Sequence, residues 1–359
     1  MKKAIGVWCV AFILLGIYIG LFLHYNSTEP VQTYIESVKS DAVPLDKHTY
    51  ISISAVGDCT LGVDINGLGG GSFDDEFEKN GRNYAHFFEN VKPIFEKDDL
   101  TIVNFEGTLS QRGERQDKEY AFRGNPLYAK ILYEGSVEAA NLANNHSMDY
   151  GETAFNDTKL HLEDSGITPF GRSEYKIIEI KGVKIGLIGT SLLTYAERIN
   201  FSKVMENLKL ENPDIIIASF HWGEENMNTP TNDQIQFAHL AIDLGADLVL
   251  GHHPHILQGI EKYNGKYIAY SLGNFCFGGN RGPKDKDTMI FGYKFCFKDG
   301  VRIFEKENAS IIPCSISSVK ERNDFKPSIL SGDEYERVKN KIISLSGNFE
   351  GIEDIEFIQ

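Results

Sequence analysis

The sequence contains little cysteine, with five residues among 359 and no Cys-x-x-Cys pair. This scarcity excludes a small domain held by a disulfide framework and a zinc site built from paired cysteines. Cys276 and Cys296 could pair across a hairpin in an oxidising compartment. A chain of this length can bury a core without disulfides, however, so buried free thiols are the expected state.

Positive charge is also scarce, because 36 Lys and Arg residues face 51 Asp and Glu residues, giving a formal net charge of -15. An acidic surface argues against nucleic acid and anionic lipid as the main partners. The glycine-rich stretch Gly67–Gly71 lacks a following Lys-Ser or Lys-Thr pair, which excludes a phosphate-binding loop there. We find no internal repeat, and a hydrophobic share of 42% predicts a globular chain of one large or two medium domains.

The segment from Ala4 to Leu23 contains no charged residue. As a helix it would span roughly 30 Å, about the thickness of a bilayer core. Lys2 and Lys3 precede it, so the positive-inside rule places the N-terminus in the cytoplasm and the bulk of the chain outside. The alternative is a cleaved signal peptide, but no Ala-x-Ala pattern follows the segment. We therefore expect a single-pass cell-membrane anchor over residues 1–25 and a polar stalk over residues 26–48.

Strand and helix patterns alternate through the middle of the chain. Short apolar runs typical of buried strands occur at 50–56, 100–105, 137–142, 175–180, 183–189, 214–220, 248–251 and 266–271. Helical spacing of apolar residues occurs at 83–96, 150–165, 202–212 and 231–244. This alternation predicts a layered α/β sandwich with mixed sheets over residues 49–315. Its last part, with strands at 288–297, 301–304 and 309–313, reads as a C-terminal β extension; a terminal helix at 333–346 and an acidic tail follow within 316–359.

Side chains that bind metals follow five of the predicted strands. They are Asp58, Glu106, Asn145 with His146, His221, and His253 with His255. Strands of an α/β sheet align such ends, so we expect these groups to converge on a metal site. The alternatives are a solvated histidine-rich turn around His252–His255 and a helix cap at Asn145 or Ser147.

The order Asp, acidic residue, Asn-His, His and His-x-His is carried by a specific set of residues. They are Gly57-Asp58 with Leu61-Gly62, Asn104, Glu106-Gly107, Asn144-Asn145-His146 with Asp149 and Gly151, His221-Trp222-Gly223, Gly251-His252-His253-Pro254-His255 and Ser271-Leu272-Gly273-Asn274-Phe275. The pattern resembles the calcineurin-like metallophosphoesterases. It is more closely similar to the bacterial capsule-synthesis protein family of the CapA/PgsA type, associated with poly-γ-glutamate capsules. The resemblance covers residues 51–277.

The resemblance implies a metallophosphatase-like fold that holds one or two divalent metal ions, with Mn, Zn and Fe as candidates. It implies the metal ligands Asp58, Glu106, Asn145, His221, His253 and His255. His146 would protonate a leaving oxygen. Residues behind the ligands or against the substrate would be Asn104, Asn144, Trp222, His252 and Asn274, with Trp222 either stacking on substrate or packing in the core.

Two positions depart from the phosphoesterase pattern. Thr60 stands where those enzymes carry a second histidine, so one metal position has one ligand fewer. Glu106 replaces the usual bridging aspartate. Both departures bear on how many metal ions the site holds.

Two functions are compatible with these features, and a third, a plain phosphodiesterase, is disfavoured by Thr60. The first is a membrane-anchored, extracellular metal-dependent hydrolase in capsule biosynthesis. The second is a non-catalytic polymer-binding or export component of a capsule assembly complex. Expected partners are an anionic capsule polymer or its precursor and other capsule-synthesis membrane proteins, and no nucleic acid. A chain with a net charge of -15 needs a local positive field to hold a polyanion, which a divalent metal could supply.

Overall fold

The computed structural model describes residues 48–67, 70–172, 174–191 and 195–359. The predicted anchor, and the predicted stalk up to residue 47, lie outside these residues. Among the helices of the described part, none has the length and apolar character needed to cross a bilayer. The membrane anchor therefore stays a prediction.

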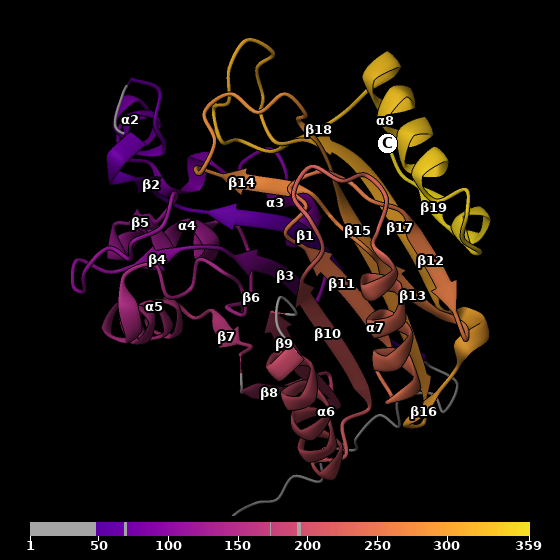
Figure 1. Ribbon diagram of the computed structural model, residues 1–359. Coiled ribbons are helices and arrows are strands. Elements are labelled where there is room, and N and C mark those ends of the chain that lie inside the picture. Colours follow the sequence, from indigo (N-terminus) through magenta and orange to yellow (C-terminus); the bar gives the residue numbers. More distant parts are fainter. Residues whose placement is uncertain (1–47, 68–69, 173, 192–194) are drawn as a thin grey trace, which may run out of the picture. The chain divides into compact units, whose positions relative to one another are not determined.

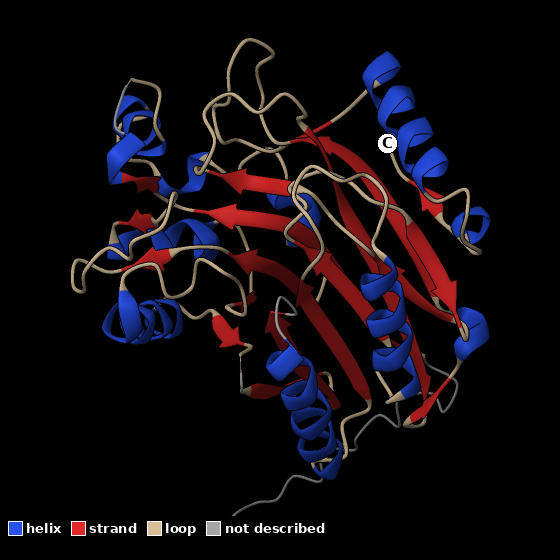
Figure 2. Ribbon diagram, in the orientation of Figure 1, coloured by secondary structure: helices blue, strands red, loops and turns tan. Residues whose placement is uncertain are grey.

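Two mixed β-sheets form the centre of the fold (Figures 1 and 2). The first has the order β18 (Ser328–Ile329), β17 (Asn308–Ser315), β15 (Asp287–Lys298), β1 (Thr49–Thr60), β3 (Leu100–Phe105), β6 (Ala139–Asn141) and β7 (Thr168–Phe170). Its additional strands are β14 (Asn274–Phe277) on β1, β16 (Val301–Arg302) on β15 and β19 (Glu356–Phe357) on β17. The second sheet has the order β12 (Ile260–Tyr263), β13 (Lys266–Ala269), β11 (Leu248–His252), β10 (Ile215–His221), β9 (Val183–Ser191) and β8 (Tyr175–Ile180). A small third sheet comprises β2 (Val63–Asp64), β5 (Phe122–Gly124) and β4 (Thr108–Leu109).

Side-chain alternation along the strands builds cores on both faces of each sheet. On β1, Ile51 and Ile53 enter a core shared with Ile215 and Ile217 of β10, so the two sheets pack against each other. The intervening residues of β10, such as Phe220, enter a separate core beneath the helices. Because successive strand residues point to opposite faces, strands this apolar must be covered on both sides. The predicted layered sandwich with mixed sheets is confirmed.

Helices cover the outer faces of the sandwich. α6 (Tyr195–Leu210) and α7 (Asn232–Asp243) lie over the second sheet. α2 (Phe73–Lys79), α3 (Lys92–Phe95), α4 (Ala129–Glu134) and α5 (Gly151–Asp164) belong with the first sheet, and α8 (Gly332–Leu345) contributes Val338 and Ile342 to the shared core. The short 3-10 helices are η1 (Ile65–Gly67), η2 (Tyr84–His86), η3 (Pro126–Tyr128), η4 (Phe304–Lys306) and η5 (Ile352–Asp354).

One expectation differs from the structure. The segment 83–96 forms η2 and the single turn α3 instead of one helix, because Pro93 lacks the N–H that a continuing helix would need. The apolar residues Phe87, Phe88 and Phe95 are nevertheless buried, as their spacing indicated.

The C-terminal strands complete the first sheet, as expected of a β extension within the same domain, and β15 lies between β17 and β1. β15 pairs antiparallel with β1 from Thr49 to Ala55, and β14 pairs parallel with the end of β1 near Asp58. Residues 316–359 add β18, α8 and β19 to the same compact unit, which spans His48–Gln359. The acidic tail that sequence patterns left unplaced thus includes β19, paired with β17.

Candidate metal centre

Asp58 and Glu106 come from neighbouring parallel strands of the first sheet. Asp58, near the end of β1, lies opposite Asn104 of β3 on one side and Asn274 of β14 on the other. Glu106 follows β3 directly, and its N–H donates to the Cys59 carbonyl at 2.8 Å. Gly57 allows β1 to approach the backbone of Gly273 closely, because a Cβ at position 57 would lie 1.9 Å from the Gly273 carbonyl oxygen.

The second sheet delivers the histidines. His221 ends β10 and is paired in register with His252, which ends β11. His253 and His255 follow in a turn with φ values of +97° and +60°. A left-handed backbone costs free energy for a non-glycine residue, and such strain clusters at functional sites. The turn therefore holds two imidazoles in positions that an unconstrained chain would avoid.

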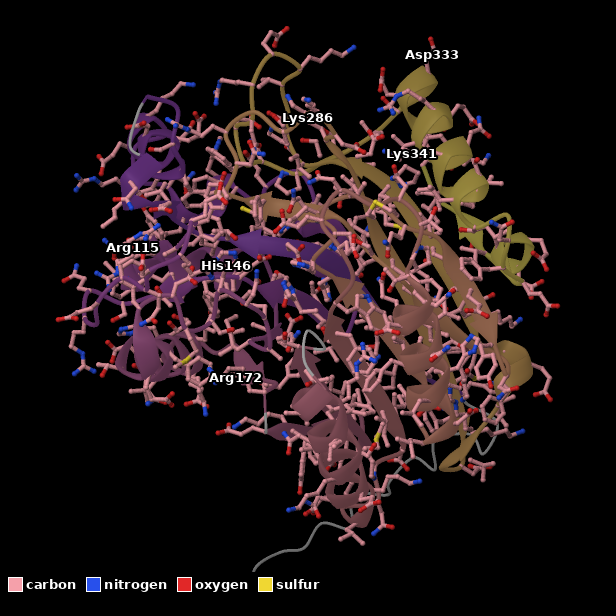
Figure 3. All side chains as sticks on the ribbon, in the orientation of Figure 1. Arg115, His146, Arg172, Lys286, Asp333 and Lys341 are labelled. Atoms are coloured by element: carbon pink, nitrogen blue, oxygen red, sulfur yellow. The ribbon has the colours of Figure 1, made fainter. Side chains whose placement is uncertain are left out.

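The two groups of side chains meet around Glu106. Its Oε1 lies 3.7 Å from His146 Nε2 and 3.9 Å from both His221 Nε2 and His255 Nε2. Asp58 lies beside it, with Oδ2 3.1 Å from His255 Nδ1 and Oδ1 3.4 Å from His252 Nδ1. Figure 3 shows His146 near the carboxyl ends of β1 and β3. Donors that are 197 positions apart in sequence therefore converge, as the alignment of strand ends predicted.

An amide network positions the carboxylates. Asn104 Nδ2 donates to Asp58 Oδ1 at 2.8 Å, while Asn104 Oδ1 accepts from Asn141 at 3.2 Å and from Asn144 at 3.4 Å. Asn145 Oδ1 lies 2.8 Å from His221 Nε2. The amides thus fix Asp58 and place Asn145 beside an imidazole.

Several buried polar atoms of the centre have no hydrogen-bond partner among the described residues. They are both carboxylate oxygens of Glu106, both ring nitrogens of His252 and Nδ1 of His253. Glu106 is fully buried, and an unpaired buried carboxylate is costly unless a positive charge lies beside it. Carboxylate, imidazole and amide oxygen donors are the mixed set that suits Mn, Zn or Fe. The residues therefore fit a divalent metal ion.

The pKa shifts of Glu106 and His255 also indicate that the buried carboxylates favour a positive charge beside them. Burial raises the pKa of Glu106 well above its usual value, with Asp58 adding to the effect. Burial would raise the pKa of Asp58 too, but the imidazoles of His252 and His255 beside it hold the pKa well below its usual value. Burial opposes protonation of His255, yet the Glu106 and Asp58 carboxylates raise its pKa to about 9. Burial lowers the pKa of His253 to about 4, so that ring offers a neutral lone pair near neutral pH.

His146 has a different setting from the other histidines. Its Nδ1 lies 2.7 Å from Asp149 Oδ2, which leaves Nε2 directed toward Glu106. Asp149 is anchored in turn by Lys118 Nζ at 2.7 Å and by the Phe122 N–H at 2.5 Å. Burial lowers the pKa of His146, and the Asp149 carboxylate opposes that shift. This is the arrangement of an imidazole whose ring is oriented by a carboxylate.

Three further sequence expectations are settled by position. Asn145 and Ser147 do not cap α5, because its N-cap is Tyr150 without a side-chain hydrogen bond. Trp222 is 2% exposed and donates through Nε1 to the Tyr270 carbonyl, so it packs in the core and does not face a substrate. Thr60 donates to the Glu106 carbonyl at 2.7 Å, so its hydroxyl does not replace the missing histidine.

The remaining predicted residues contact the centre, and others join them. Asn274 Oδ1 lies 2.9 Å from His255 Nδ1, and Asn144 Oδ1 accepts from the His146 N–H at 3.1 Å. Sequence patterns gave no role to Lys118, Asn141 or Glu225. None of these residues is among the motif residues that carry the family resemblance, and none forms a recognisable pair with a residue nearby in sequence. Asp149 belongs to the motif but was assigned no role, although its position three residues after His146 could have indicated that the two side chains interact.

The linear order of these residues decides the family. Residues 52–279, which contain every residue of the predicted site, match the family model described as "Bacterial capsule synthesis protein PGA_cap". The chain belongs to this family. It is 31% identical over 258 residues to the PGA biosynthesis protein CapA of Bacillus subtilis, covering 65% of this chain and 67% of that one. It is 27% identical over 287 residues to the capsule biosynthesis protein CapA of Bacillus anthracis, covering 71% and 67%.

A third relative comes from another bacterial genus. The chain is 28% identical over 208 residues to a probable polyglutamine synthesis accessory protein of Mycobacterium tuberculosis, covering 49% of this chain and 55% of the relative. The chain is thus a member of the bacterial capsule synthesis protein family, and its relatives are described as PGA biosynthesis, capsule biosynthesis and probable polyglutamine synthesis accessory proteins.

Proposed function

We propose that this PGA_cap protein is a membrane-anchored, extracellular metal-dependent hydrolase with a metallophosphatase-like site, acting on a bond formed during capsule polymer production. The observation that carries the proposal is the fully buried Glu106 carboxylate, which has no hydrogen-bond partner among the described residues and faces three imidazoles. Asp58, Glu106, Asn145, His221, His253 and His255 would hold the metal, as one or two ions of Mn, Zn or Fe.

The chain's own groups suit hydrolysis of a phosphoester or a related bond. A bound divalent cation would supply a nucleophilic hydroxide near neutral pH and would stabilise negative charge on the reacting oxygens. His146 would protonate the leaving oxygen through Nε2, because Asp149 holds Nδ1 and stabilises the imidazolium. Lys118 keeps Asp149 in place.

The test uses the full-length protein with a chromogenic phosphodiester and added Mn²⁺. We expect turnover in the wild type and its loss in His146→Ala. His161→Ala, on α5 outside the centre, is the matched control and should keep the wild-type rate. Absence of turnover in the wild type with every divalent metal tried would exclude the phosphodiesterase form of the proposal.

A second candidate function, that of a non-catalytic polymer-binding component, is favoured by a cavity lined by residues outside the metal centre. It has a volume of about 660 Å³, and its basic lining residues are Lys284, Lys286, Lys320, Arg322 and Arg337. The acidic lining residues are Asp285, Asp287 and Glu321. Asp285 and Asp287 are paired with Lys341 or Arg337, and the basic lining residue Arg322 is paired with Glu76. Figure 3 shows Lys286 and Lys341 near α8, away from His146.

This cavity would give a chain of net charge -15 a local positive field for an anionic capsule polymer or its precursor. Lys286 Nζ donates to the backbone carbonyls of Val319, Lys320 and Arg322 at 3.2, 2.8 and 2.6 Å, and it makes no ion pair with a carboxylate of the described residues. Binding of poly-γ-glutamate that is lost in Lys284→Glu/Lys320→Glu, without loss of hydrolysis, would support this role. Equal binding by the variant would refute it.

The proposed location and partners need a separate experiment. The N-terminus would lie in the cytoplasm, the main domain would lie outside the cell membrane, and other capsule-synthesis membrane proteins would be the protein partners. External protease should then degrade residues 48–359 in intact cells without a cell wall. Full protection would contradict the proposed orientation.

A further inference from the structure

We infer that Glu225 is an additional metal ligand at the rim of the centre, and that with His253 and His255 it defines a second cation position. The inference rests on the proposed metal-binding function and extends it to a residue outside the family motif. One ligand atom from each of these three residues lies within 4.8 Å of the others. A separate triad of Asp58, Glu106 and His221 satisfies the same criterion deeper in the protein.

One of the two histidines of the outer triad, His253, has a lone pair to offer. His253 is 8% exposed, and its Nδ1 has no hydrogen-bond partner among the described residues. Its ring lies 4.6 Å from that of His221 and 5.9 Å from that of His255, measured between centroids. A buried imidazole without a partner is costly, and coordination of a cation would satisfy it.

The loop that carries Glu225 is fastened to the histidine turn. Before it, the Trp222 N–H donates to the His252 carbonyl at 3.1 Å. After it, the Asn226 N–H donates to the Pro254 carbonyl at 2.9 Å. Asn226 has a φ of +60°, so this connection is held in a strained conformation. The two bonds bracket Glu225 and fix its backbone beside His253 and His255.

A second set of bonds braces the same loop from behind. Gln258 Nε2 donates to the Met227 carbonyl at 2.8 Å, and Asn228 Nδ2 donates to the Leu257 carbonyl at 3.1 Å. Glu225 itself is exposed and makes no hydrogen bond or ion pair with any described residue. An exposed carboxylate on a braced loop is preorganised for a ligand that comes from solvent.

Charge explains why a carboxylate is needed at this place. The inner triad has two carboxylates for one imidazole, whereas the outer triad would have only imidazoles without Glu225. Two dications at close range repel each other, so an anionic ligand at each position favours joint occupancy. Thr60 donates its hydroxyl proton to the Glu106 carbonyl and carries no negative charge. Glu225 supplies both a donor atom and the charge.

The neighbouring Glu224 provides a matched control. It lies on the same exposed loop, one residue earlier, and is absent from both metal-competent triads. Glu225→Gln and Glu224→Gln therefore remove the same charge from the same loop and differ only in the proposed coordination. Because both side chains are exposed, neither change should prevent folding, which thermal unfolding in EDTA would verify.

The test is a Mn²⁺ titration of the full-length protein, with bound ions counted by elemental analysis and spin coupling between ions followed by electron paramagnetic resonance. We expect two ions and a coupled signal for the wild type and Glu224→Gln. Glu225→Gln should retain one ion, with the dissociation constant of the second raised at least about tenfold and the coupled signal lost.

Other outcomes overturn the inference and can be told apart from failure of the proposed function. Two ions of unchanged affinity in Glu225→Gln, or a single ion in the wild type that both variants retain, would refute the role of Glu225 even if hydrolysis persists. A wild type that binds two ions and loses one in Glu225→Gln, yet hydrolyses nothing, would sustain the inference and remove the hydrolase. A wild type that binds no ion refutes both.

Discussion

Replacing Glu106 with glutamine should affect stability in opposite directions with and without metal. Glu106→Gln keeps the shape but removes a fully buried carboxyl group that has no hydrogen-bond partner among the described residues. In EDTA the variant should unfold at the same temperature as the wild type or above it, because it lacks a buried carboxyl group whose oxygens have no hydrogen-bond partner among the described residues. With metal, the wild type gains the free energy of binding and the variant loses a carboxylate ligand.

The size of the effect follows from linkage. A cation present at 1,000 times its dissociation constant stabilises the folded state by about 4 kcal/mol. An unfolding entropy of about 2.1 cal/mol/K per residue over roughly 300 residues converts this gain into a rise in Tm of about 6 °C. We expect the wild type to show a rise of this order on adding Mn²⁺ and Glu106→Gln to show less than about a third of it.

Differential scanning calorimetry in EDTA and in Mn²⁺ measures both quantities. Glu138→Gln is the control, because that carboxylate accepts from the Thr101 N–H at 2.7 Å and lies outside both metal-competent triads. Its metal-induced shift should equal that of the wild type. An equal Mn²⁺ shift in Glu106→Gln and wild type would refute the assignment of Glu106 as a ligand.

Three other changes test separate parts of the structure. Asp149→Asn should lower kcat by about 10²–10⁴-fold while metal content and KM stay near wild type, because Asp149 orients His146 and is hydrogen-bonded to none of the proposed metal ligands' side chains; a changed metal content would contradict this. Burial raises the pKa of Glu138 to about 7, above its unfolded value, so stability should fall by up to about 3 kcal/mol as pH rises from 4.5 through 7. Urea unfolding should show this slope in the wild type and a flatter one in Glu138→Gln. Trp222→Ala should cost about 3–5 kcal/mol of stability without raising KM, since the ring packs in the core; a higher KM at unchanged stability would show substrate contact.

Short-range patterns predicted most strands and the donors at their ends. Asp58, His221 and His253 could be found because each follows or ends an apolar run, and parallel strands bring such ends to one edge. The buried free thiols Cys59, Cys276, Cys296 and Cys314 are also as expected. These features depend on local periodicity and burial, which a single sequence displays.

Features that depend on long-range pairing were missed. The insertion of β15 beside β1 joins segments more than 230 residues apart, and neither segment signals its partner. Lys118 reaches Asp149 from an irregular segment, and Glu225 reaches His253 from a loop, so neither lies at a strand end. The departure of 83–96 from a helix was readable at Pro93, but the apolar spacing of its buried phenylalanines was stronger evidence for a helix.

The double pairing of β1 has a consequence for biogenesis. Its first half needs β15 and its second half needs β14, so a nascent chain cannot complete its first strand until about residue 298 has been synthesised. Until then Asp58 has its neighbour Asn104 on β3 but lacks its neighbour Asn274 on β14. Truncation before residue 287 should therefore leave an unpaired strand edge that invites aggregation rather than a smaller working protein.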